Sequence, residues 1–262
     1  MIERSPAQVL RRVRVAIDGP AGAGKSTVAR GLARRLGYVL LDTGALYRTV
    51  ALAAMRADVD LADVEGIGAV ARALVATDAI AVEASESAPT SLPPGIPHSE
   101  IGGSGMRVLL RGEDVSLLIR TPEMSTGASR VSAIPAVRAA LLAMQRRAGE
   151  EGGVVLEGRD IGTVVLPDAE AKFFLTASPE VRARRRFEEL SVRGKPVTLA
   201  ETLAEVIARD RADTEREVAP LRCADDAILV DSSGRPAHDI IEEMARIVEE
   251  RAAPIPSSAR LR

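Results

Sequence analysis

The stretch Val13-Arg-Val-Ala-Ile-Asp-Gly-Pro-Ala-Gly-Ala-Gly-Lys-Ser-Thr27 decides the fold class of this 262-residue chain. Its first five residues are apolar apart from one arginine and predict a buried strand. Gly19-Pro-Ala-Gly-Ala-Gly-Lys-Ser26 then matches the pattern G-x-x-x-x-G-K-[ST] in full. Lys25–Leu36 follows as a predicted helix, because Val28 and Leu32 share one face. A glycine-rich turn can match the pattern by chance, but the flanking strand and helix favour a phosphate-binding loop.

This loop has the chemistry of a nucleoside triphosphate site. Its glycines let backbone N–H groups curl around phosphates, and the helix that begins there adds favourable partial charge. Lys25 is expected to reach the β- and γ-phosphates, and the Ser26 hydroxyl to ligate Mg²⁺. The residues predicted to bind the triphosphate are Gly19, Pro20, Ala21, Gly22, Ala23, Gly24, Lys25, Ser26 and Thr27.

Strands and helices alternate along the rest of the chain, which is typical of a parallel sheet covered by helices. Further strands are predicted at Tyr38–Leu41, Val154–Glu157, Ala171–Thr176 and Ala227–Asp231, and further helices up to about Met55, from Pro135 to about Ala148, after Pro179, from near Thr198, and over Pro236–Arg251. We therefore expect an α/β fold of the P-loop kinase type, with a five-stranded parallel sheet flanked by helices.

The middle of the chain departs from this alternation. Ala79–Glu83 and Met106–Val115 are predicted to be strands of a small excursion. Residues 85–105 between them are rich in Ser, Pro and Gly and are expected to form a flexible loop without chemistry.

Composition excludes several classes of protein. Lys and Arg number 35 against 37 Asp and Glu, and aromatic residues make up only 2%, which argues against a nucleic-acid-binding surface. A single cysteine, Cys223, rules out an internal disulfide, and two histidines rule out a His-rich metal site. No apolar stretch approaches the length of a membrane span or of a signal peptide. We expect no nucleic-acid or membrane partner and a cytoplasmic location.

The phosphate-binding loop alone leaves the reaction open. A GTPase would need an Asn-Lys-x-Asp motif, and the chain contains no Asn. Asp231-Ser-Ser-Gly234 fits the D-x-x-G switch pattern, but it lies far downstream and so short a pattern is weak evidence. A motor-type ATPase could use Asp231 after a strand, but no Glu follows it.

Arginines stand where a phosphate acceptor would need them. Arg48 follows a predicted strand, Arg159 and Asp160 end another, and 182–195 holds six basic residues. In phosphoryl transfer, catalysis is mostly positioning and neutralisation of negative charge, for which arginines are suited. The alternative for 182–195 is a solvated helix face.

Together these stretches resemble the bacterial-type cytidylate kinases, which make CDP from CMP and ATP. The resemblance extends from Ile17 to about Val230. Beyond the loop it is carried by Leu41-Asp-Thr-Gly-Ala-Leu-Tyr-Arg48, Gly112-Glu-Asp-Val115, Ile119-Arg-Thr-Pro-Glu123, Ala128-Ser-Arg-Val-Ser132, Pro135-Ala-Val-Arg138, Glu157-Gly-Arg-Asp-Ile-Gly-Thr-Val-Val165, Arg209-Asp-Arg-Ala-Asp-Thr-Glu-Arg216 and Ala219-Pro-Leu221.

The resemblance implies a set of site residues for CMP or dCMP. Thr43 and Arg48 would contact the ribose and phosphate region, and Ser129 and Arg138 the cytosine. Residues implied to bind phosphate, sugar or base, or to close the site, are Arg159, Asp160, Arg209, Asp213 and Arg216. Those implied to be catalytic are Lys25, Arg159, Asp160, Arg185 and Arg186, with Ser26 on Mg²⁺.

The resemblance also implies how the chain is divided. Residues 1–57 and 136–262 would form the P-loop core, with a lid at about 183–197. Residues 58–135 would form an enlarged monophosphate-binding insertion, whose loop at 85–105 is longer than is usual in the family. We expect a monomer that binds only small molecules.

Alternatives remain for individual residues and for the function. Asp160 and Asp213 could be structural partners of arginines, and Thr43 could be a helix N-cap. The acceptor could be UMP or AMP, or the protein could be a nucleotide-dependent switch.

Overall fold

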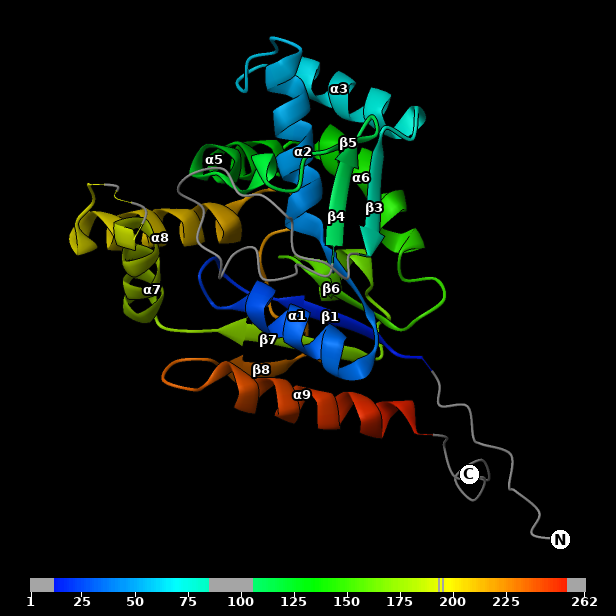
Figure 1. The fold of residues 1–262 in the computed structure, drawn as a ribbon, viewed down its shortest axis with the longest axis vertical. Helices are drawn as coiled ribbons and strands as arrows, with labels where there is room; N and C mark the ends of the chain where they lie inside the picture. The colour runs from blue at the N-terminus through cyan, green and yellow to red at the C-terminus, as the bar shows by residue number, and fades with distance from the viewer. Residues whose placement is uncertain (1–11, 85–105, 193, 195, 254–262) are drawn as a thin grey trace, which may run out of the picture.

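The computed structural model describes residues 12–84, 106–192, 194 and 196–253. At its centre lies the predicted five-stranded parallel sheet, with the strand order β2-β6-β1-β7-β8 (Figure 1). The strands are β1 (Arg14–Asp18), β2 (Val39–Asp42), β6 (Val154–Glu157), β7 (Ala171–Thr176) and β8 (Ile228–Asp231). Because all five run the same way, their carboxyl ends lie along one edge of the sheet.

Both faces of this sheet are buried, because apolar residues fill both alternating sets of positions. Val15 and Ile17 pack toward α1 (Lys25–Leu36) and α9 (Ala237–Ala252), which lie together on one face. Ala16 between them belongs to a second apolar cluster on the other face.

The second cluster continues beyond the sheet into the middle of the chain. It takes in α2 (Thr43–Arg56), α3 (Val64–Ala76), α6 (Pro135–Arg147) and an antiparallel sheet of β3 (Ile80–Ala84), β4 (Met106–Leu110) and β5 (Glu113–Asp114). The short helices η1 (Leu118–Arg120) and α5 (Pro122–Val131) pack against α2. The segment 58–135 thus shares one apolar core with the central sheet.

Two expectations for this segment need correction. The predicted strand Met106–Val115 is a hairpin, in which Arg111 and Gly112 have positive φ angles of 53° and 84° and turn the chain between β4 and β5. Helices α3 and α5 were not predicted, although buried residues recur at helical spacing in both, such as Ile67, Ala71 and Leu74 in α3. The predicted loop at 85–105 lies outside the described residues.

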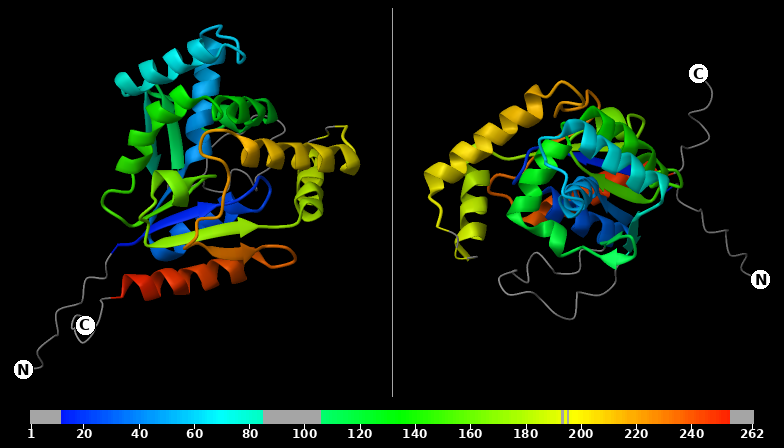
Figure 2. Two further views of the ribbon diagram at one scale, coloured as in Figure 1. Left: turned by 180° about the vertical axis from the view of Figure 1, so that it is seen from behind. Right: turned by 90° about the horizontal axis from the view of Figure 1, so that it is seen from above.

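Helices α7 (Pro179–Val192) and α8 (Leu199–Glu215) pack against each other and extend to one side of the sheet (Figure 2). α8 begins with a capping box, in which Thr198 and Glu201 bond reciprocally to backbone N–H groups. Arg193 and Lys195, which belong to the predicted basic run, lie outside the described residues. Among the described helices, none is long and apolar enough to cross a bilayer.

Candidate active site

The phosphate-binding loop leaves the carboxyl end of β1 in a conformation that requires glycine. Gly19 has a φ angle of 144°, and a Cβ atom there would lie 1.9 Å from the carbonyl oxygen of Leu175 on β7. Gly22 and Gly24 also have positive φ angles. The loop is therefore pressed against the sheet, with α1 beginning directly after it.

Lys25 is buried at the start of α1, where its ammonium donates to the carbonyl oxygen of Pro20 at 2.7 Å. Burial lowers its pKa well below the ordinary value, and the charge of Arg159 lowers it further. A cation held in so unfavourable a place gains from a bound anion. The buried ammonium of Lys25 therefore lies where the motif predicts a contact with the phosphates.

Glu157, at the end of β6, is the acidic residue of this loop region that sequence analysis quoted but did not assign. The Ser26 hydroxyl donates to its Oε2 at 3.0 Å, while its buried Oε1 has no hydrogen-bond partner among the described residues. Burial and the charge of Asp42 raise its pKa to about 7. An acid that ends a buried strand beside the lysine of a phosphate-binding loop is a signal that could have identified it.

The oxygen atoms of Ser26 and Glu157 fit a magnesium ion. Mg²⁺ prefers hard oxygen ligands and usually keeps several waters, so one or two protein oxygens and the substrate phosphates suffice. Within the described residues there is no cluster of three or more His, Cys, Asp or Glu that could hold a metal ion by itself.

Thr43 and Arg48 lie at the start of α2, beside Glu157. Asp42, not Thr43, is the N-cap of this helix, since its side chain accepts from the N–H of Ala45. The Thr43 hydroxyl instead donates to the carbonyl oxygen of Glu157 at 2.8 Å. Arg48 donates to Asp42 at 2.5 Å and to the carbonyl oxygen of Gly44.

Arg138 and Asp160 form a buried ion pair between α6 and the end of β6. The guanidinium lies 5.6 Å from the centroid of the Tyr47 ring, and Arg216 approaches the other oxygen of Asp160 at 3.7 Å. Arg138 also donates to the carbonyl oxygen of Ser132.

Ser129 is linked to Arg138 through Ser132. The Ser132 hydroxyl donates to the carbonyl oxygen of Ser129, which places Ser129 one step from Arg138. The structure thus brings the residues predicted to read cytosine into one region.

Arg159 and Arg209 bring positive charge together from β6 and α8. Arg159 donates to Asp213 at 2.8 Å, whereas the buried Nε of Arg209 has no partner among the described residues. Burial, the charge of Arg159 and smaller contributions from Arg186 and Arg48 together lower the pKa of Arg209 to about 10. We call Arg48, Arg159, Arg186 and Arg209 the arginine cluster. It is a natural site for a phosphate.

Asp160 and Asp213 each form an ion pair with an arginine, as the structural alternative for these two residues expected. Asp160 is paired with Arg138, and Asp213 with Arg159. Such pairs keep buried charges neutral until a ligand exchanges places with one partner.

The basic run 182–195 does not act as one unit. Arg182 is buried and binds Asp210 through two nitrogens, at 2.8 and 2.6 Å, so it joins α7 to α8. Arg185 reaches Ser232, and Arg186 pairs with Glu189. Only Arg184 among these described residues is fully exposed, as the solvated-face alternative expected.

The Asp231–Gly234 stretch lies beside the phosphate-binding loop. Asp231 is exposed on the edge strand β8 and accepts from the N–H of Ser233. The Ser232 hydroxyl donates to the carbonyl oxygen of Ala23, which ties this stretch to the phosphate-binding loop.

Asp18 is the residue of this edge that sequence reasoning missed most completely. It ends β1 directly before Gly19, is buried, and accepts hydrogen bonds from the N–H groups of Ile161 and Gly162. A single acid in a motif that begins one residue later carries no periodic signal.

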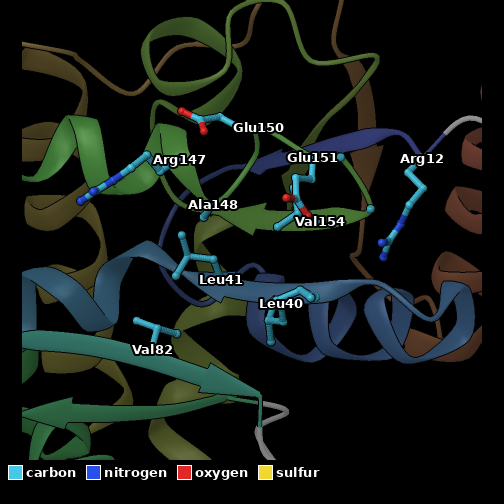
Figure 3. A pocket seen from close by; sticks show the side chains of 12 residues that line it. Arg12, Leu40, Leu41, Val82, Arg147, Ala148, Glu150, Glu151 and Val154 are labelled. Atoms are coloured by element: carbon cyan, nitrogen blue, oxygen red, sulfur yellow. The ribbon is translucent and has the colours of Figure 1, made fainter. Parts of the chain in front are cut away.

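A cavity of about 290 Å³ lies elsewhere, at the amino ends of β2 and β6 (Figure 3). Arg12, Arg147, Glu150 and Glu151 are among the residues that line it. Ligands of open α/β sheets bind at the carboxyl ends of the strands, where the phosphate-binding loop lies. The cavity is therefore separate from the candidate site.

Comparison with known proteins gives one consistent result. A family model described as cytidylate kinase matches residues 15–250. The cytidylate kinase of Geobacter sp. (strain M21) is 50% identical over 239 residues, which cover 91% of this chain and 94% of that protein. The cytidylate kinase of Pseudomonas aeruginosa (strain UCBPP-PA14) is 47% identical over 237 residues, covering 90% and 95%.

Solved structures match at lower identity. TT1252 from Thermus thermophilus gives a TM-score of 0.42 at 19% identity, with 93% of this chain and all of that chain covered. A shikimate kinase from Acinetobacter baumannii, in complex with shikimate, gives a TM-score of 0.38 at 16% identity, with 96% of each chain covered.

Proposed function

The chain belongs to the cytidylate kinase family and transfers the γ-phosphoryl group of ATP to CMP, and we propose that this transfer takes place between the phosphate-binding loop and the arginine cluster. The observation that carries the proposal is the half-buried Arg209, whose buried Nε has no partner among the described residues and whose pKa is lowered by burial and by neighbouring cations. A phosphate there would satisfy the donor and neutralise the cluster.

The donor side is the loop Gly19–Thr27 with Lys25. We propose that backbone N–H groups of the loop hold the ATP phosphates and that Lys25 moves its ammonium from Pro20 to the β- and γ-phosphates. Ser26 and Glu157 would hold Mg²⁺, which when bound neutralises phosphate charge. Arg185, whose guanidinium lies within 3.5 Å of the carbonyl oxygen of Gly22, would close over the donor from α7.

The acceptor side lies between α2, α6 and α8. In this proposal Arg48, Arg159 and Arg209 bind the CMP phosphate, and Asp213 and Thr43 lie beside the ribose. Ser129, Arg138, Asp160 and Arg216 surround the cytosine. Supporting this arrangement, Asp160 faces Arg138 and Arg216, whereas Asp213 pairs with Arg159 and interacts electrostatically with Arg209 and Arg216, so it lies where the two sides meet.

The chemistry requires charge neutralisation rather than a strong base. The acceptor phosphate is already ionised, so its oxygen can attack the γ-phosphorus without losing a proton to the protein. Arg159 and Arg186 are placed to neutralise the charge that spreads over the transferred group. Asp160 would act by holding Arg138 and Arg216 in place.

The finer properties follow from the same site. Nothing described around Asp213 excludes a 2′-deoxyribose, so we propose that dCMP is also accepted. Nucleotide substrates support a cytoplasmic location.

Replacement of Lys25 by Met tests the donor assignment. The donor phosphates lose their cation while the acceptor site is built by other segments, so turnover should fall by about two orders of magnitude or more with CMP affinity nearly unchanged. The measurements are the rate of CDP formation and the dissociation constant for CMP. Arg34→Met, on the exposed side of the same helix, is the matched control and should keep normal turnover. Near-normal turnover of Lys25→Met would contradict the assignment.

A further inference from the structure

Asp18 is a buried carboxylate for which the proposed transfer has no use. Only 4% of the residue is exposed, and burying a charge in such a place is unfavourable unless hydrogen bonds compensate. Two bonds do so: Oδ1 accepts from the N–H of Ile161 at 2.8 Å, and Oδ2 accepts from the N–H of Gly162 at 2.7 Å. Both acceptor oxygens are therefore engaged by one short segment.

That segment is the first turn of η2, a π-helix over Ile161–Val165. The first N–H groups of a helix have no partner within the helix, so Asp18 supplies the acceptors that they lack. Gly162 allows this approach, since a Cβ atom there would lie 3.4 Å from Asp18 Oδ2 and 3.2 Å from the Lys172 side chain. Arg159 and Asp160 immediately precede this turn.

We propose that Asp18 is a positioning residue that fixes the turn carrying Arg159 and Asp160 and so sets the geometry of the acceptor site. Because Gly19 follows Asp18 in the chain, the same residue ties that turn to the phosphate-binding loop. The proposal rests on the function assigned above to Arg159 and Asp160. It makes the relative placement of donor and acceptor depend on one side chain.

The role requires a carboxylate. An asparagine in the same place offers one acceptor oxygen, and its NH₂ group would face the second N–H, which leaves two donors opposed. Asp18→Asn is therefore nearly isosteric, and it removes the double acceptance together with the negative charge of the carboxylate. Loss of one hydrogen bond should let the turn move slightly, and small misplacements of the groups that it carries weaken binding or catalysis strongly.

Protonation should have a similar effect. Burial raises the pKa of Asp18 to about 6, although the two N–H groups oppose this change. The other titratable groups that face or adjoin it are Asp160 before η2, Lys25 on α1, Glu157 on β6, Lys172 on β7 and Cys223 before β8. As pH falls through about 6, the acceptor of one N–H is lost.

The test compares Asp18→Asn with the wild type by steady-state kinetics at saturating partner substrate. The expected result is that KM for CMP rises about tenfold or more, while KM for ATP changes by less than about threefold. The matched control is Asp226→Asn, which removes a charge from the exposed partner of Lys172 behind the same turn without touching η2. Equal rises in both KM values, or a fall in melting temperature alone, would overturn the proposal.

A pH series supplies a readout that a purely structural role would not move. The ratio of KM for CMP between variant and wild type should shrink below about pH 6, because the wild type then also loses its ionised carboxylate. Titration of the CMP phosphate is the same for both proteins and cancels in this ratio. A ratio constant from pH 5 to 8 would overturn the proposal.

Two further variants distinguish an error in the role of Asp18 from an error in the assignment of the acceptor site. Gly162→Val crowds the same contact from the other side, where a Cβ atom alone would already lie 3.4 Å from Asp18 Oδ2. This variant replaces Asp18→Asn should that variant not fold, and it should raise KM for CMP in the same direction. Arg159→Met tests the site itself. A raised KM for CMP in Arg159→Met with none in Asp18→Asn overturns only the role of Asp18. No change in Arg159→Met overturns the assignment of the acceptor site.

Discussion

At the scale of single residues, the site is a set of buried charges that neutralise one another while no substrate is bound. Arg138 holds Asp160, Arg159 holds Asp213, and Lys25 has only a carbonyl oxygen. Truncating one partner of such a pair leaves an unpaired buried charge. Any variant of this site must therefore be tested for stability as well as for activity.

The base-reading residues give a prediction at this scale. Cytosine presents a ring-nitrogen acceptor and an amino donor where uracil presents an N–H and a carbonyl. Arg138 can only donate and Ser129 can accept, so the pair suits cytosine. With uracil one buried donor stays unpaired, which costs roughly 1–3 kcal/mol, or about 5- to 150-fold in discrimination.

Arg138→Met together with Ser129→Ala should therefore reduce the ratio of kcat/KM for CMP over UMP, mainly by weakening CMP. The measurement is turnover with each acceptor at one fixed ATP concentration. Melting temperatures control for the loss of the Asp160 partner, and Arg216 remains to pair with that carboxylate. An unchanged ratio in a folded double variant would show that these residues do not read the base.

Some residues of the site could be predicted from the sequence, and others could not. Lys25 and Ser26 were predictable because the loop pattern fixes their positions, and Arg48, Arg138 and Arg209 because family motifs surround them. Asp18 and Glu157 also lie in such motifs, at strand ends, but their contacts with Ile161 and with Ser26 become visible only in the structure. Sequence spacing also placed the N-cap of α2 one residue too late.

At the scale of elements, the central strands were predictable because they are continuous apolar runs buried on both faces. The helices and strands between α2 and α6 were less predictable. The stretch 106–115 is apolar enough for one strand, but its Arg-Gly pair turns the chain. Helices α3 and α5 pack against α6 and α2 with buried residues at helical spacing, such as Ile67, Ala71 and Leu74 of α3, a pattern that the sequence analysis did not use.

The register of β3 and β4 leads to a prediction for the segment between them. Ala84 and Met106 are paired neighbours in this antiparallel sheet, so a two-residue Asn-Gly turn can join them directly. Replacing 85–105 by this turn should change the free energy of unfolding by less than about 2 kcal/mol, since closure entropy depends weakly on loop length. Denaturant unfolding measures this change.

The kinetics of the same variant test whether the segment has a role in the reaction. Composition predicts none, so kcat and KM for CMP should each stay within a few-fold of the wild type. A large rise in KM for CMP, with KM for ATP unchanged, would mean that residues 85–105 contribute to the acceptor site.

At the scale of the whole molecule, two buried acids at the carboxyl edge of the sheet titrate differently from one acid at its amino edge. At the carboxyl edge, burial raises the pKa of Asp18 to about 6 and that of Glu157 to about 7. Because folding raises both pKa values, ionisation of these two groups lowers the free energy of unfolding as pH rises through the raised values. Functional sites that need charge often carry such a loss of stability. At the amino edge, hydrogen bonds from Arg14 outweigh burial and hold the pKa of Glu170 at about 2.

Glu170 and Arg14 therefore predict how acid affects the fold. Arg14, at the start of β1, donates to Glu170 from its backbone N–H, its Nε and its Nη2, at 2.9, 3.1 and 3.0 Å. Because the folded pKa lies below the ordinary value of 4.5, the ionised group contributes stability above about pH 4.5. That contribution is lost progressively as pH falls toward 2.

Glu170→Gln should lower the free energy of unfolding at pH 7 by about 1–3 kcal/mol, the usual contribution of hydrogen bonds to a charged group. The gap from the wild type should narrow as pH falls from 4.5 toward 2, as followed by urea unfolding at each pH. Glu242→Gln, in the exposed pair with Arg35, is the control and should cost less than about 0.5 kcal/mol. Since Glu170 lies at the edge of the sheet opposite the phosphate-binding loop, kcat and both KM values should stay unchanged below the melting temperature. A stability gap that is the same at pH 3 and pH 7 would show that the carboxylate's charge does not hold the two strands together.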